Sequence, residues 1–230
     1  MQTAPNARLQ VTEHNEYVSR AAYDVSCNRA LAQAAGFQGK EMAATNPPQQ
    51  LHMLWPEERL ASPPTVKVPP GYRLRVYEPS DLAPYLKLMS TAGLGEWNTE
   101  RLEAVVVKVL PNGFFVIEHS ASDELVAGAM AMHNPRPLHP HGGELSWVAA
   151  SPAHAGKGLG TAVCAAVVAR LLRAGYERIY LCTDDPRLPA LKVYLKLGFI
   201  PFLLAPDMPG RWRAVCEKLG RPFTPEKWPA

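Results

Sequence analysis

The stretch Leu145-Ser-Trp-Val-Ala-Ala-Ser-Pro-Ala-His-Ala-Gly-Lys-Gly-Leu-Gly-Thr161 decides the fold of this chain. Its apolar first half predicts a β-strand, its glycines predict a turn, and the apolar residues that follow predict a helix. Gly156, Gly158 and Gly160 leave the surrounding backbone N–H groups uncovered, and the N-terminus of the following helix carries a partial positive charge. The combination predicts a loop that binds an anion, such as a phosphate group.

The spacing of these glycines excludes two common nucleotide-binding motifs. A P-loop has a lysine directly after its last glycine, whereas here Thr161 follows Gly160 and Lys157 lies between glycines. A dinucleotide-binding turn needs a third glycine where Thr161 stands. It also follows its strand more closely than Gly156 follows Ala150.

Two segments together resemble the GNAT superfamily of N-acetyltransferases. Ala155-Gly-Lys-Gly-Leu-Gly160 resembles the Arg/Gln-x-x-Gly-x-Gly/Ala signature, with Ala155 in place of Arg or Gln. Leu188-Pro-Ala-Leu-Lys-Val-Tyr-Leu-Lys-Leu-Gly-Phe199 resembles the family's later helix, which has a tyrosine at its middle and ends in Gly-Phe. Arg187 stands where the family often has Asn. The same half of the chain also resembles the mycothiol-synthase-type branch.

The resemblance covers about 71–219 and implies an α/β GNAT fold, with a mixed, mostly antiparallel central sheet flanked by helices. The hydrophobic patterns agree with it. Strands are expected at 72–77, 114–117, 125–132, 145–150, 178–183 and 200–204, and helices at 80–88, 99–107, 159–171 and 188–198. The family usually closes with a further strand, whereas 211–219 is predicted to be helical.

The chain is expected to divide into an N-terminal helical and Pro-rich extension, 1–70, and a GNAT acyltransferase domain, 71–230. Residues 17–37 are predicted to be helical, and the end of this segment is either an ordinary helix end or the relic of a duplicated domain. Seven prolines between Pro47 and Pro70 predict a linker or an extended wrap. Four apolar residues within it are expected to pack onto the main domain: Leu51, Met53, Leu54 and Trp55.

The composition limits the partners. The net charge of +3 is mild, and no basic run with interleaved aromatic residues predicts a nucleic-acid surface. No apolar run is long enough to span a bilayer and the N-terminus does not resemble a signal peptide, so a cytoplasmic protein is expected. The cysteines form no C-x-x-C pair and are expected to be free thiols, with a nucleophilic Cys182 as the minor alternative. His139 and His141 lack a third ligand, so no metal is expected. A homodimer is compatible with the sequence.

The resemblance implies acetyl-CoA as the co-substrate, with its pyrophosphate in the glycine loop and its pantetheine arm beside the preceding strand. The cofactor-binding residues are then Trp147, Val148, Ala149, Ala155, Gly156, Lys157, Gly158, Leu159, Gly160 and Thr161. The backbone N–H of Val148 is the expected donor to the oxyanion that forms on the thioester.

Transfer of an acyl group to an amine also needs an acid and a base. The resemblance implies Tyr194 as the acid that protonates the departing thiolate, and Glu144 is the first choice of base. Asp184 or Asp185 could instead accept the proton, or bind the ammonium of a small-molecule or peptide acceptor. Arg136 and His133 are expected beside the acceptor, with Arg136 free to meet an acidic group. A non-catalytic acyl-CoA-binding or sensing domain is the alternative function, because Ala155 and Arg187 depart from the family's pattern.

Overall fold

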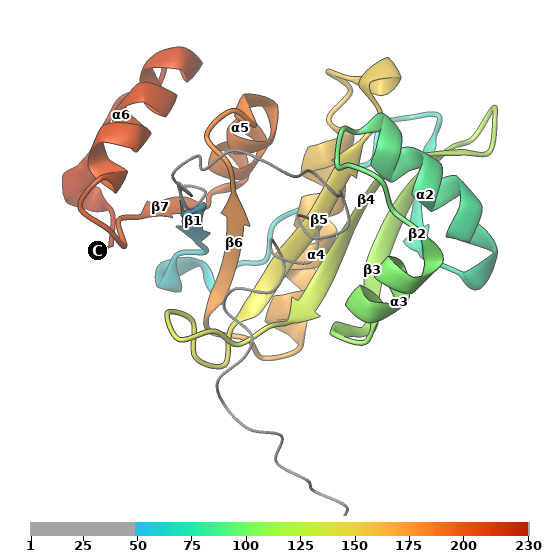
Figure 1. Cartoon of the computed structure of the whole chain (residues 1–230), viewed down its shortest axis with the longest axis horizontal. Helices are drawn as coiled ribbons and strands as arrows, with labels where there is room; N and C mark the ends of the chain where they lie inside the picture. The colour runs from blue at the N-terminus through green and yellow to red at the C-terminus, as the bar shows by residue number, and fades with distance from the viewer. Residues whose placement is uncertain (1–48, 230) are drawn as a thin grey trace, which may run out of the picture. The chain divides into compact units, whose positions relative to one another are not determined.

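A seven-stranded mixed sheet organises residues 49–229, the part of the chain that this computed structural model describes (Figure 1). The strand order is β2-β3-β4-β5-β6-β1-β7, and all neighbouring strands are antiparallel except β5 and β6. The predicted fold class is therefore confirmed.

The strands are β1 (Leu51–Leu54), β2 (Tyr72–Val76), β3 (Val109–His119), β4 (Glu124–His133), β5 (Gly143–Ala150), β6 (Ile179–Thr183) and β7 (Ile200–Phe202). The α-helices are α2 (Leu82–Thr91), α3 (Thr99–Val106), α4 (Leu159–Arg173), α5 (Leu188–Leu197) and α6 (Met208–Leu219). The short 3-10 helices are η1 (Glu57–Arg59), η2 (Pro79–Asp81), η3 (Pro152–His154) and η4 (Pro225–Lys227).

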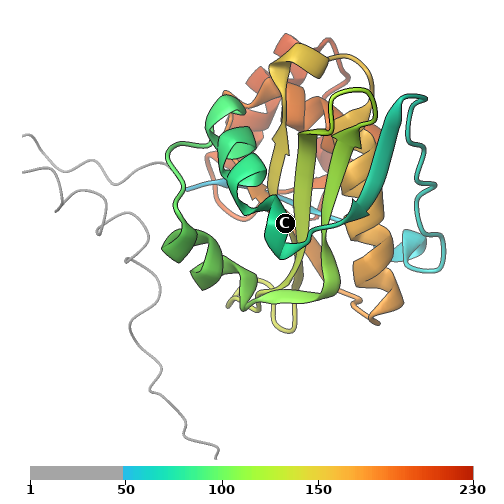
Figure 2. The ribbon, with the colours of Figure 1, turned by 90° about the vertical axis from the view of Figure 1, so that its right-hand side faces the viewer.

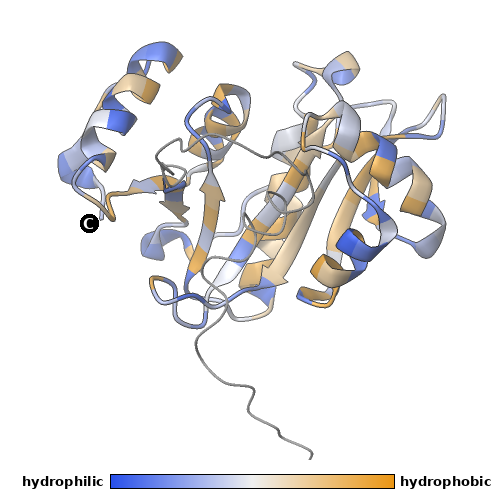
Figure 3. Ribbon diagram, in the orientation of Figure 1, coloured by the Kyte–Doolittle hydropathy of each residue, from blue (hydrophilic) through white to orange (hydrophobic). Residues whose placement is uncertain are grey.

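Helices cover the two faces of the sheet, with α2 and α3 on one face and α4 on the other (Figure 2). The alternation of strand side chains explains this layering. Ala129 and Ala131 of β4 pack in the cluster that contains α4, whereas Met130 and Met132 pack in the cluster that contains α2. Figure 3 shows β3 and β4 as largely hydrophobic, while hydrophilic and hydrophobic residues alternate along α6. The central strands are thus buried on both faces, which is why their sequences are apolar almost throughout.

The helix starts differ slightly from the sequence-based expectation. Asn98, the residue before the predicted helix start, caps α3, because its side chain accepts a hydrogen bond from the backbone N–H of Arg101 (2.9 Å). Before α2, Glu78 and Asp81 form a reciprocal capping box around η2. The predicted helix at 211–219 is present and begins three residues earlier, as α6.

Strand β1 lies inside the sheet, between β6 and β7. Leu51 pairs with Thr183 on one side, and Leu54 pairs with Ile200 on the other. The sequence predicted only that this segment packs onto the main domain as part of an extension. The compact unit that holds the sheet begins at Pro48, so the expected boundary between 70 and 71 falls within that unit. An extra strand does complete the sheet, but the chain supplies it from before β2, since the residues after β7 form α6.

Some expectations fall on residues that the structure does not describe. The predicted helix at 17–37, the duplication hypothesis and Cys27 lie outside 49–229. Within this range no helix combines the length and the apolar character that a membrane crossing requires.

Candidate active site

The glycine loop has the conformation that an anion-binding loop needs. Gly156 (φ +77°) and Gly158 (φ +82°) both adopt left-handed backbone conformations, which only glycine adopts without strain. Gly158 is also the N-cap residue of α4, and no side chain caps this helix. Within residues 49–229, the backbone N–H groups of residues 156–161 have no hydrogen-bond acceptor. The loop therefore offers a row of free donors at a helix N-terminus, which fits a pyrophosphate.

Not every predicted loop residue contributes to this row of donors. The N–H of Ala155 donates to the carbonyl of Pro152 (3.1 Å), so this residue provides neither a side chain nor a free backbone donor. The Leu159 side chain is buried in the core and only its backbone faces the loop. The ammonium of Lys157 lies 2.8 Å from the hydroxyl of Tyr72, which also hydrogen-bonds to His154. No pattern in the sequence indicated this link to β2.

Among residues 49–229, no strand pairs with the β6-facing edge of β5 beyond Glu144. The two parallel strands pair only at Gly143 with Ile179 and Glu144 with Tyr180, and they diverge beyond this shared base (Figure 1). The carbonyl of Val148 accepts a hydrogen bond from Arg187 at the start of α5 (3.4 Å), so it points away from β4. The N–H of a strand residue points to the same edge as its carbonyl. Val148 thus directs its N–H to the edge where the thioester is expected.

The register of β5 shifts at Trp147. This residue has φ +52°, and the pairing with β4 is irregular between Gly128 and Met130. The bulge turns the Trp147 indole toward Trp97, whose ring centroid is 4.5 Å away at an interplanar angle of 82°. The guanidinium of Arg101 lies over both rings. Trp147 therefore packs against the α2–α3 region. No pattern in the sequence identified Trp97 and Arg101 as its neighbours.

Tyr194 is buried on α5, with 4 % of its surface exposed. Burial, followed by the neighbouring Cys164 thiol, raises its pKa well above the usual range for a phenol. No group within residues 49–229 hydrogen-bonds to its hydroxyl. Tyr194 is therefore protonated at neutral pH and has a free O–H donor, as an acid requires.

Glu144 lies in the last residue pair that joins β5 to β6 before the two strands diverge, and it is also buried. Its Oε2 atom accepts a hydrogen bond from Asn134 Nδ2 (2.5 Å) and lies 3.3 Å from the Tyr180 hydroxyl, whose shorter hydrogen bond is to the carbonyl of Asn134 (2.5 Å). Arg136 Nη2 lies 3.6 Å from the same oxygen. Within the described residues Oε1 has no partner, so one carboxylate oxygen remains able to accept a proton.

Arg136 and His133 both have partners among the described residues. Arg136 is not free, because its guanidinium pairs with Glu144 and lies over the Tyr180 ring. His133 faces Tyr176, with Nδ1 2.8 Å from the hydroxyl, and both border a surface hollow of about 610 Å³ beside the end of α4. His133 is therefore not brought together with Glu144.

The two aspartates after β6 point to different partners. Asp185 forms a two-point pair with Arg211 of α6, at 2.5 and 3.0 Å, and this pair lowers its pKa. Asp184 is exposed and accepts a hydrogen bond from Gln50 (3.2 Å). Of the two carboxylates, Asp184 is the one left open to a cationic acceptor.

A pair of buried histidines connects β1 to this region. His52 Nδ1 lies 2.8 Å from His139 Nε2, and the His139 ring stacks on Tyr180 with a centroid distance of 3.9 Å. Arg178 Nε donates to His139 Nδ1 (3.3 Å), so the proton of His139 is on Nε2 and donates to His52. Burial lowers the pKa of His52 to about 4 and that of His139 to about 3, and both rings are neutral at pH 7.

Cys182 does not have the surroundings of a nucleophile. Cys182 is half-buried, and burial, with Glu144 nearby, raises its pKa to about 12, which disfavours a thiolate.

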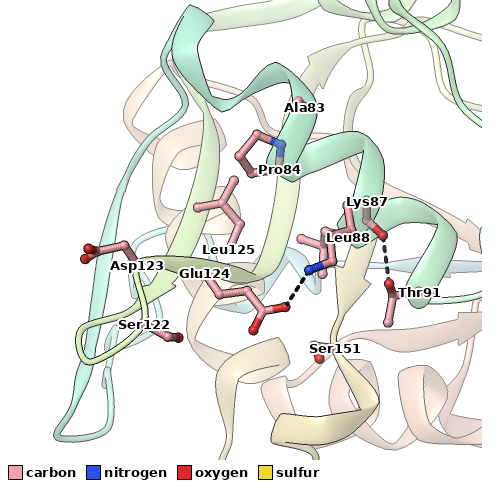
Figure 4. Close-up of a pocket in the computed structure, with 10 residues that line it drawn as sticks. All are labelled: Ala83, Pro84, Lys87, Leu88, Thr91, Ser122, Asp123, Glu124, Leu125 and Ser151. Atoms are coloured by element: carbon pink, nitrogen blue, oxygen red, sulfur yellow. Dashed lines mark hydrogen bonds and ion pairs between the residues drawn. The ribbon is translucent and has the colours of Figure 1, made fainter.

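A groove of about 530 Å³ lies between α2 and the β3–β4 turn, where Lys87 approaches Glu124 (3.7 Å) and Ser151 lies at one side (Figure 4). None of the predicted site residues lines it.

Comparison with known proteins agrees with this geometry. The family model described as "Acetyltransferase (GNAT) family" matches residues 82–199, and the chain belongs to this family. It is 30 % identical over 163 residues to a mycothiol acetyltransferase from Thermobispora bispora, covering 64 % of this chain and 53 % of the relative. It is also 30 % identical over 161 residues to a mycothiol acetyltransferase from Nocardia farcinica, covering 64 % and 52 %. The chain thus spans about half the length of the curated relatives it matches.

Among solved structures, the fold is similar to a GCN5-related N-acetyltransferase from Sphaerobacter thermophilus. The TM-score is 0.54 at 18 % identity, with 78 % of this chain and 54 % of that chain covered. At this identity the likeness supports the fold alone.

Proposed function

We propose that this protein transfers the acetyl group of acetyl-CoA to an amine by direct attack on the thioester. The observation that carries the proposal is the row of N–H groups at residues 156–161, which have no acceptor among the described residues and follow the edge of β5 that β6 leaves unpaired. The donors of the loop suit the pyrophosphate of coenzyme A, and the unpaired edge of β5 suits its pantetheine arm. The predicted loop residues act through their backbone, with Ala155 as the exception.

The chemistry follows from the groups around this edge. The amine nitrogen bonds to the carbonyl carbon, and the Val148 N–H stabilises the oxyanion. The bond from carbon to sulfur then breaks, and Tyr194 donates a proton to the thiolate. The amine gives up its proton to Glu144, directly or through a water, at the oxygen that has no protein partner.

Asp184 is the candidate for binding the ammonium form of the acceptor before it loses its proton, and Trp147 forms a wall of the acceptor site. Arg136 acts on Glu144 and not on the acceptor. The acceptor is a small-molecule amine or a peptide amine, and homodimer formation and a cytoplasmic location remain predictions of the sequence.

The test begins with isothermal titration of acetyl-CoA into the full chain, and absence of binding would overturn the proposal. Release of free coenzyme A is then measured with tyramine, spermidine, glucosamine, L-lysine and a lysine-containing peptide. Tyr194→Phe and Glu144→Gln are each expected to lower kcat by about 10²-fold or more, while Tyr176→Phe serves as a control outside the site. Binding of acetyl-CoA without turnover on any amine would favour the sensing function instead.

A further inference from the structure

The C-terminal end of α5 is held by a residue that lies far away in the sequence. Arg59, at the end of η1, donates from Nη1 to the carbonyl of Leu197, the last residue of α5 (3.0 Å). The last carbonyls of a helix have no partner within the helix, and a cation at this end also interacts favourably with the helix dipole. Arg59 therefore caps the helix that carries Tyr194.

The Gly-Phe ending of this helix is shaped to fit that cap. Gly198 has φ +117°, and a Cβ atom at this position would overlap the guanidinium of Arg59. The glycine thus provides both the backbone conformation and the space for the arginine. A helix end by itself accounts for a glycine at position 198. The sequence therefore did not indicate that the Arg59 guanidinium fills the space beside it.

The arginine is itself fixed by Trp55. Its guanidinium lies 4.7 Å from the centroid of the Trp55 ring, and Trp55 Nε1 donates to the carbonyl of Arg59 (3.2 Å). Trp55 is buried, and its backbone N–H donates to Ile179 of β6 (2.9 Å). The cap is therefore anchored to the central sheet.

The same residues contact the surroundings of Tyr194. The Trp55 ring meets Phe199 edge-on at 5.4 Å, and Phe199 meets Tyr194 edge-on at 6.3 Å. The backbone N–H groups of Gly198 and Phe199 both donate to the carbonyl of Tyr194 (3.0 Å each). A displacement of the α5 end would be transmitted to the Tyr194 backbone and ring.

We propose that Arg59, stacked on Trp55, is a positioning residue for Tyr194, so that the segment before β2 contributes to acetyl transfer without touching the substrates. The inference rests on the proposed role of Tyr194 as the acid. Residues 55–59 lie outside the part of the chain that the family model matches.

The kinetic test compares Arg59→Met with Arg173→Met, which removes an exposed arginine from the last turn of α4. With the fastest amine of the panel above, Arg59→Met is expected to lower kcat by roughly 10- to 100-fold. The KM for acetyl-CoA should change by less than about twofold, because the glycine loop is not touched. Arg59→Lys, which keeps the charge, should recover part of the loss.

A double-mutant cycle separates positioning from a general loss of stability. In the Tyr194→Phe background, Arg59→Met is expected to change kcat by less than about twofold, since the acid is already absent. An equal loss in both backgrounds, or no loss in the single variant, would overturn the inference. A Tyr194→Phe variant with unchanged kcat would instead overturn the proposed acid, and the positioning role with it.

Hydrogen exchange gives a readout that needs no acceptor. Peptides covering 188–199 should exchange faster in Arg59→Met than in the unmodified chain, while Arg173→Met leaves them unchanged. The same comparison with Arg59→Lys applies if Arg59→Met does not fold. Unchanged exchange at 194–199 in a folded Arg59 variant contradicts the inference.

Discussion

His52 of β1 accepts a hydrogen bond from His139, and the 2.8 Å contact joins a residue before β2 to the loop that follows β4. Because Arg178 donates to the other nitrogen of His139, the direction of each proton in the pair is defined. His139 in turn stacks on Tyr180, whose hydroxyl reaches Glu144. Strand β1 thus supports the surroundings of Glu144, the proposed base. The turn after β1 carries Arg59, which caps the helix of Tyr194, the proposed acid.

The histidine pair predicts a pH dependence of stability. Burial lowers the pKa values of His52 and His139 to about 4 and about 3, below the value of 6.5 that applies to the unfolded chain. The unfolded state then binds more protons below pH 6.5, so the free energy of unfolding falls as pH decreases from 6.5 toward 4. Each histidine contributes a slope of up to about 1.4 kcal/mol per pH unit. Urea unfolding between pH 7 and 4 measures this slope, and it should flatten in His52→Gln and His139→Gln. His141→Gln, at an exposed position, should keep the slope of the unmodified chain.

Gly158→Ala should weaken the binding of acetyl-CoA. The new side chain meets no protein atom within 4 Å, so the cost in stability is backbone strain at φ +82°, about 1 kcal/mol. Its methyl group would lie among the free N–H donors, and an increase of at least about tenfold in Kd is expected. Gly175→Ala is the matched control, since Gly175 has φ +81° and open space but lies beyond the end of α4. Calorimetric titration and thermal unfolding of both variants give the comparison, and equal Kd values would contradict the assignment of the loop.

Gly198→Ala should destabilise the protein more than a change of backbone conformation alone can explain. The added methyl group would displace the Arg59 guanidinium as well as strain the backbone, and we expect a loss of about 2–3 kcal/mol. Gly220→Ala, at a helix end with φ +60° and open space, should cost only about 1 kcal/mol. In an Arg59→Ala background the cost of Gly198→Ala should fall toward that of Gly220→Ala. Urea denaturation of the four variants tests this, and purely additive losses would show that the arginine does not occupy the space.

Asp184 and Asp185 should respond differently to replacement by asparagine. Asp185→Asn removes a two-point ion pair with Arg211 and is expected to cost about 1 kcal/mol of stability at pH 7. The pKa of Asp185 is lowered in the folded state, so this contribution is present at neutral pH and is lost as pH falls below about 4. Asp184→Asn should leave the stability within about 0.5 kcal/mol and raise the KM for a cationic acceptor severalfold. If Asp185→Asn raised that KM while Asp184→Asn did not, the roles would be reversed.

The local sequence determined the central part of this protein. Gly156, Gly158 and the apolar residues after Thr161 define a strand, a left-handed turn and a helix start through interactions between residues close in the chain, so the anion-binding loop and its place in an α/β sheet were predictable. The same holds for α5, whose apolar spacing and Gly198 end are local features.

Only the tertiary structure decided where β1 lies and what it contacts. Its four residues are all buried, so they show no alternation, and the prolines on either side of the strand resemble those of a linker. Their hydrogen-bond partners in β6 and β7 follow more than 120 residues later, and no local pattern specifies that register. The His52–His139 contact and the Arg59 cap both depend on this long-range arrangement. The sequence alone therefore predicted the loop that is proposed to bind the co-substrate, while folding determined which distant side chains support the proposed acid and base.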